Sequence, residues 1–174
     1  DKVTLIGSAT MYKSEYRSSK GAGYIPSAWD NRFIVNVSAV YELPKYWSIG
    51  AKISAIGGSP YTPYDEGTSS LKLVWDSSGR PVYDYTRYNG ERLDPYYQID
   101  LRVDKNFYFR KWTLGLYVDL QNVTFSRIRQ PDAYLSTGKI INPQELPAVQ
   151  RYELETLELY SGTMVPAIGI TAEF

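Results

Sequence analysis

The chain has 174 residues, 19 basic and 19 acidic side chains and 17 tyrosines, but neither cysteine nor histidine. The missing residue types exclude disulfides, thiolate nucleophiles, histidine-ligated metal sites and Ser-His-Asp triads. A net charge of zero and a pI near 6.5 argue against a nucleic-acid partner, which usually meets a basic surface.

Hydrophobic runs are short throughout the chain. The longest, residues 164–170, contains Pro166 and falls far below the about 20 residues that a membrane helix needs. The sequence opens on Asp1 without a basic and apolar leader, so we expect a signal peptide to have been removed or to belong to a part that precedes this chain.

Apolar and polar residues alternate with a period of two along most of the chain, which predicts an all-β protein. In the second segment, for example, Phe33, Val35 and Val37 share one phase and Asn36 and Ser38 the other. Six segments carry the pattern, and they span residues 3–11, 33–43, 47–55, 97–109, 112–121 and 166–174.

The connections between these segments are of two kinds. Pro44, Lys45 and Tyr46 form one tight hairpin turn, and Arg110 and Lys111 form the other. The remaining connections are long, at residues 14–30, 62–95 and 123–162. Short turns at one end and long loops at the other are typical of an outer-membrane β-barrel, with the turns in the periplasm and the loops outside the cell.

Aromatic residues in the apolar phase gather at the strand ends. Tyr97 and Phe107 lie about 33 Å apart along their strand, which corresponds to about 25 Å in height after a tilt of about 40°. That height matches the apolar band of a membrane barrel, where aromatic rings mark both boundaries with water. The predicted lipid-interface aromatics are Phe33, Tyr41, Trp47, Tyr61, Tyr97, Phe107, Phe109 and Trp112.

The fold class predicted is therefore an all-β, antiparallel, up-and-down transmembrane β-barrel. Six strands are too few to close such a barrel, for which about eight is the lower limit. We expect residues 1–174 to be the C-terminal segment of one barrel domain, with earlier strands absent. A soluble all-β barrel or sandwich stays open as an alternative, because the same alternation would place the apolar face in a core.

Several motifs resemble those of TonB-dependent outer-membrane receptors, particularly the Bacteroidetes type. They are Tyr24–Phe33 (YIPSAWDNRF), Gly57–Tyr64 (GGSPYTPY), Arg92–Lys105 (RLDPYYQIDLRVDK), Asp119–Thr124 (DLQNVT) and Val165–Phe174 (VPAIGITAEF). In that family, the terminal strand carries a signal read by the barrel-assembly machinery. On this chain the resemblance assigns that signal to Ile168, Ile170, Ala172 and Phe174.

The resemblance implies a receptor in the outer membrane of a Gram-negative bacterium that imports a scarce ligand: a siderophore, a cobalamin-like compound, a glycan or a peptide. Its expected partners are outer-membrane lipid, an N-terminal plug, the remaining strands, and a TonB-type coupling protein that acts on the absent N-terminal part. A passive porin-like barrel is a second alternative, which the absence of a plug and coupling box upstream would distinguish.

Within and just after the loop 62–95, the stretch Tyr83–Tyr97 is the candidate ligand loop, because it combines tyrosine with charge. A solvated, variable outer loop without ligand contact is the alternative. Residues 71–75 and 82–85 flank Asp76–Arg80, which predicts a hairpin extension there. With neither cysteine nor histidine in the chain, we expect no catalytic residue, cofactor or metal. An acid/base pair of Asp100 and Asp104 is not expected either, because they lie about 13 Å apart on one strand with Arg102 between them. The candidate ligand residues are Tyr83, Asp84, Arg87, Tyr88, Asn89, Glu91 and Arg92.

Overall fold

The computed structural model describes residues 2–174, of which strands make up 53% and helices 8%, so that strands determine the architecture. One large antiparallel sheet contains six long strands in the order β1-β4-β5-β8-β9-β14. These strands are β1 (Val3–Met11), β4 (Phe33–Leu43), β5 (Trp47–Ile56), β8 (Tyr96–Tyr108), β9 (Thr113–Gln121) and β14 (Val165–Glu173). Every end of these strands lies within one residue of the end of the predicted segment.

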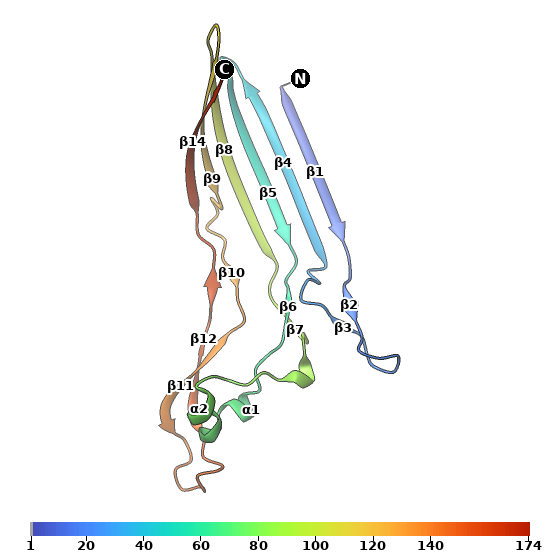
Figure 1. Cartoon of the computed structure of the whole chain (residues 1–174), viewed down its shortest axis with the longest axis vertical. Helices are drawn as coiled ribbons and strands as arrows, with labels where there is room; N and C mark the ends of the chain where they lie inside the picture. The colour runs from blue at the N-terminus through green and yellow to red at the C-terminus, as the bar shows by residue number, and fades with distance from the viewer. Residues whose placement is uncertain (1) are drawn as a thin grey trace.

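Each long strand pairs with the next long strand along the chain, which is the up-and-down order predicted from the sequence. Figure 1 shows them side by side in a single layer. The sheet does not close on itself within residues 2–174, and β1 and β14 are its edges.

The two ends of the sheet differ in the length of their connections. The β4–β5 turn, the β8–β9 turn and the C terminus lie at one end, and the long connections lie at the other (Figure 1). Short ladders within the long connections are β2 (Glu15–Tyr16) with β3 (Ile25–Pro26), β6 (Pro60–Tyr61) with β7 (Glu91–Arg92), β10 (Ile128–Arg129) with β13 (Tyr160–Ser161), and β11 (Ala133–Ile140) with β12 (Tyr152–Leu157). The helices are α1 (Glu66–Ser69), α2 (Lys72–Ser78) and the 3₁₀ helix η1 (Tyr85–Arg87).

Both predicted hairpin turns are present. Lys45 and Tyr46 adopt positive φ values of 63° and 61°, which reverse the chain between β4 and β5 without a glycine. The Tyr46 ring packs edge-on against Tyr108 with a centroid distance of 4.8 Å. In the other turn, the Phe109 N–H donates to the Trp112 carbonyl at 2.9 Å and closes the hairpin.

The register of the ladders collects side chains of one phase on one face. One row across the sheet consists of Leu5, Ala39, Ala51, Leu101, Leu120 and Pro166. The next row of that phase consists of Val3, Tyr41, Ile49, Val103, Val118 and Ile168. A row of the opposite phase contains Val40, Gly50, Arg102 and Asp119. The sheet therefore has one apolar face and one largely polar face.

Neither face is covered by a second layer. Within residues 2–174 no hydrophobic side chain is buried, and the fully buried side chains are those of Asp30 and Ser69. Ile53, in the middle of β5, is 51% exposed. A soluble sandwich needs a second sheet or helices packed on the apolar face, and the part of the chain described has neither.

The predicted hairpin at residues 71–85 is wrong, because residues 72–78 form α2. Lys72 and Asp76 form an ion pair at the helical spacing of four residues, and Gly79 ends the helix in the left-handed conformation with φ 62°. The hairpin that does extend the loop end is β11–β12, which the sequence did not indicate. Neither α1 nor α2, nor any other helical segment of residues 2–174, has the length and apolar composition needed to span a membrane.

Candidate functional site

The predicted interface aromatics of the turn end lie close to one another. The rings of Phe109 and Trp112 stack with centroids 4.4 Å apart, and Trp112 stacks on Phe174 at 6.2 Å. Tyr41, Trp47 and Phe107 lie in the apolar phase of their strands near the same end, and all three are exposed. These residues form a row of rings along one edge of the apolar face.

A second set of rings lies at the loop end of the same face. Phe33 begins β4, and Tyr97 lies at the start of β8. The structure does not place Tyr61 on this face, because β6 belongs to a separate ladder with β7 and Tyr61 lines a hollow with Tyr83 and Tyr88. Tyr97 is 57% exposed. Seven of the eight predicted aromatics thus fall into two levels, and between these levels the apolar face carries aliphatic side chains such as Ile53 and Val103.

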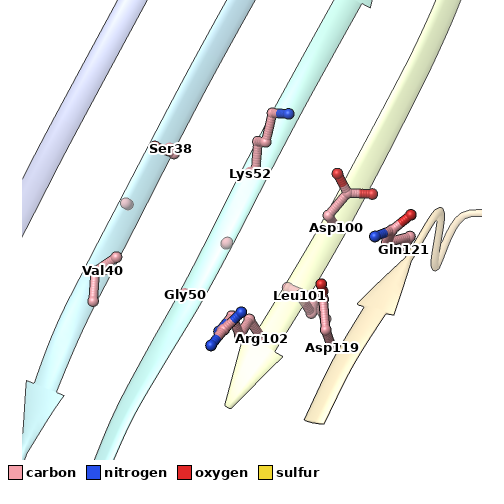
Figure 2. A pocket seen from close by; sticks show the side chains of 11 residues that line it. Ser38, Val40, Gly50, Lys52, Asp100, Leu101, Arg102, Asp119 and Gln121 are labelled. Atoms are coloured by element: carbon pink, nitrogen blue, oxygen red, sulfur yellow. The ribbon is translucent and has the colours of Figure 1, made fainter. Parts of the chain in front are cut away.

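The polar face carries a hollow of about 300 Å³ near mid-strand. Figure 2 shows Lys52, Asp100 and Gln121 on three neighbouring strands, with Arg102 and Asp119 beside them. Lys52 is the register partner of Asp100, and Arg102 that of Asp119. Opposite charges on adjacent strands stabilise the pairing, and Gly50 leaves the space open because it has no side chain.

Arg102 is held in place by two neighbours on the polar face. Its guanidinium donates to the carboxylate of Asp104 at 2.7 Å and lies 4.1 Å from the ring centroid of Tyr117. The Tyr117 ring in turn covers Gly169 of β14, where a Cβ would meet the ring at 2.1 Å. Asp104 is therefore an ion-pair partner of Arg102.

The bases of two of the long loops meet at a buried carboxylate, Asp30. It is fully buried, accepts a hydrogen bond from the Ser14 N–H at 2.8 Å, and pairs with Arg92 at 2.9 Å and Arg32 at 3.0 Å. Arg92 also donates to the Gly58 carbonyl at 2.6 Å. Asp30 therefore ties the β1–β4 connection to the β5–β8 connection, although the two are far apart in the sequence.

Burial alone raises the pKa of Asp30, because it penalises the charged form. Two opposing effects outweigh burial: hydrogen bonds from Ser14 and Arg92, and the positive charges of Arg32 and Arg92. The pKa of Asp30 therefore falls below the ordinary value of 3.8. The carboxylate is thus ionised at neutral pH, and its charge is satisfied from three sides.

The predicted ligand loop divides into anchoring and exposed residues. Asn89 is buried and donates to the Pro26 carbonyl at 2.8 Å, Asp84 caps η1 by accepting from Thr86 N–H at 3.0 Å, and Arg92 belongs to the Asp30 cluster. Arg87 forms an ion pair with Glu91. Tyr83 and Tyr88 are exposed, so the structure does not gather the seven predicted residues into one site.

Tyrosines of this loop line two adjoining hollows of about 350 and 290 Å³. Tyr64 stacks on Tyr83 at 4.6 Å, and Tyr85 on Tyr88 at 6.4 Å. Burial raises the pKa of Tyr64 to about 12, and a hydrogen bond to Tyr83 adds to the effect, so this hydroxyl stays protonated. The predicted ligand residues do not include Tyr64 and Tyr85. The alternation of tyrosine at positions 83 and 85 is a signal that could have indicated Tyr85.

In the described part of the chain, no group of three or more Asp or Glu side chains could hold a metal ion. Comparisons of the sequence and structure with protein-family models, curated proteins and solved structures found no match. The geometry of the two faces and the two ends is therefore the basis for any functional argument.

The Asp30 cluster makes a prediction about stability. Asp30→Asn leaves Arg92 and Arg32 without their buried partner, so it lowers the free energy of unfolding in detergent micelles by about 3–5 kcal/mol at neutral pH. Asp94→Asn is the matched control, because the Asp94 side chain is 77% exposed and changes stability by less than about 0.5 kcal/mol.

The pH dependence follows from the lowered pKa of Asp30. The stabilisation is complete above the unfolded value of 3.8 and is lost as pH falls through the lower folded value. In urea titrations, the difference between the wild type and Asp30→Asn therefore stays constant from neutral pH down to about pH 5 and shrinks below pH 4. Equal stabilities of Asp30→Asn and Asp94→Asn at neutral pH would contradict the role given to Asp30.

Proposed function

We propose that this sheet is part of the wall of an outer-membrane β-barrel, in a TonB-dependent receptor that imports a scarce ligand into a Gram-negative bacterium. One observation carries the proposal: six strands in register present a continuous apolar face that nothing in residues 2–174 covers. Hydrocarbon is the surrounding in which such a face is stable without a core.

The aromatic levels support the same orientation. Rings at the turn end and the loop end of the apolar face enclose an aliphatic band, and β8 is long enough to cross a bilayer core of about 25 Å at the usual tilt. Trp and Tyr favour these boundaries, because the ring contacts acyl chains while the polar atom meets water. In a soluble sheet, no boundary between water and lipid would favour Trp and Tyr at the two strand ends.

The lengths of the connections indicate how the sheet would be oriented across the membrane. The β4–β5 and β8–β9 turns correspond to the periplasmic side, and the long loops with their tyrosine-lined hollows correspond to the cell exterior. The polar face, with Lys52, Asp100 and Arg102, then faces the lumen and its plug. The free edges of β1 and β14 would pair with further strands of the same barrel, since unpaired backbone groups are costly in lipid.

Transport by such a receptor also requires a plug and a coupling protein, which we propose from the resemblance of the motifs. The plug would close the lumen, and a TonB-type coupling protein would open it with energy from the inner membrane. The ligand remains one of the four classes named from the sequence.

The lipid-facing assignment makes a prediction for adjacent residues of β5. Ile53→Arg places a charge on the apolar face and costs about 2–4 kcal/mol of folding free energy in phospholipid bilayers. Ser54→Arg is the matched control on the polar face; it loses one hydrogen bond, to Asn36, and costs about 1 kcal/mol. Equal costs for the two variants in urea unfolding from vesicles would contradict the assignment.

Conductance separates an energy-coupled receptor from a passive porin. The complete protein, purified from outer membranes and inserted into a planar bilayer, is expected to give no steady ion conductance, because the plug fills the lumen. Stepwise channels of constant conductance would favour the porin alternative and overturn the receptor proposal.

A further inference from the structure

Lys105 is the one charged side chain in the apolar phase of the six long strands. It lies in β8 between Val103 and Phe107, and its register partners are Trp47 and Leu116. A lysine on a lipid-facing surface is costly unless its ammonium reaches the boundary with water. Because Lys105 lies near the turn end of β8, its ammonium is close to the proposed boundary with water.

The ammonium of Lys105 lies among rings at this boundary. Its Nζ is 4.9 Å from the ring centroid of Phe107, 5.5 Å from Trp47 and 5.8 Å from Tyr46, all within the range of cation–π attraction. It also donates to the backbone carbonyl of Lys45. An ammonium has three N–H donors, so two of them are available to a ligand after this bond.

The two short turns at this end of the sheet carry basic side chains. Lys45 lies in one short turn, and Arg110 and Lys111 lie in the other, and all three are exposed. Within residues 2–174 neither Lys105 nor these three residues form an ion pair. The acidic residues nearest in register, Glu42 and Asp104, belong to the polar phase, and Asp104 is paired with Arg102.

We infer that Lys105 and the basic turns bind the phosphate of an anionic phospholipid headgroup on the periplasmic side, which rests on the proposed function. The two available donors of Lys105 would meet phosphate oxygens, and Lys45, Arg110 and Lys111 would add positive potential around them. Leu116 and Val103, which are 37% exposed each, continue the apolar face directly beyond the ammonium. They offer contact to an acyl chain, which is why a lipid suits the site better than free phosphate.

The test uses the full chain in mixed micelles with equal amounts of phosphatidylcholine and phosphatidylglycerol, and native mass spectrometry to measure the lipid that stays bound. We expect the wild type to retain phosphatidylglycerol about fivefold over phosphatidylcholine. Lys105→Met keeps the length of the side chain and removes the charge, so the preference falls towards parity. Lys105→Arg retains it, and Lys52→Met, on the polar face, leaves it unchanged.

Three outcomes would overturn the inference: no preference in the wild type, an equal preference in Lys105→Met, or loss of bound phosphatidylglycerol when inorganic phosphate is added. The last result would mean that the site recognises the anion without its acyl chains. Quenching of Trp47 fluorescence by brominated acyl chains tests the underlying proposal separately, in a variant whose other three tryptophans are replaced by Phe. If Trp47 is not quenched in that variant, the membrane assignment fails; if it is quenched but the lipid preference does not depend on Lys105, only the present inference fails.

Discussion

The backbone ladder across six antiparallel strands is the constraint on which the structure depends. With no hydrophobic side chain buried in residues 2–174, stability cannot come from a packed interior and has to come from paired strands and from what surrounds the sheet. Because side chains alternate strictly along a strand, an unshifted register across the sheet sorts them onto two faces. The apolar face and its aromatic boundaries are consequences of that register.

The loop end is organised by a different principle. There, polar side chains satisfy one another and the backbone: Asp30 binds Arg92 across 62 positions of sequence, and Asn122 is buried with its amide donating to the Ser126 carbonyl. At Gly57 an added Cβ would lie 1.8 Å from the Asn31 carbonyl oxygen, so the chains approach as closely as glycine permits. Such junctions hold long loops in place without apolar packing, and they leave the tyrosines free at the surface.

The sequence predicted the strands well and the loops poorly, for a physical reason. A strand such as β8 can be predicted from the local alternation between Tyr97 and Phe107. The turn at residues 44–46 can be predicted from its proline. By contrast, Asp30 is indistinguishable from a surface aspartate until its distant arginine partners are known. The segment 71–75 has too few residues to separate a strand from a helix by period, and Lys72 with Asp76 stabilises the helix.

The central claim is that the odd-numbered phase of β8 faces hydrocarbon and the even-numbered phase faces water. Nitroxide labels placed singly at residues 97–104, with the chain reconstituted in phospholipid vesicles, measure this directly through their collisions with oxygen and with a water-soluble nickel complex. Labels at 97, 99, 101 and 103 should collide with oxygen, and those at 98, 100, 102 and 104 with nickel. An absence of alternation, or the opposite phase, would contradict a lipid-facing apolar surface.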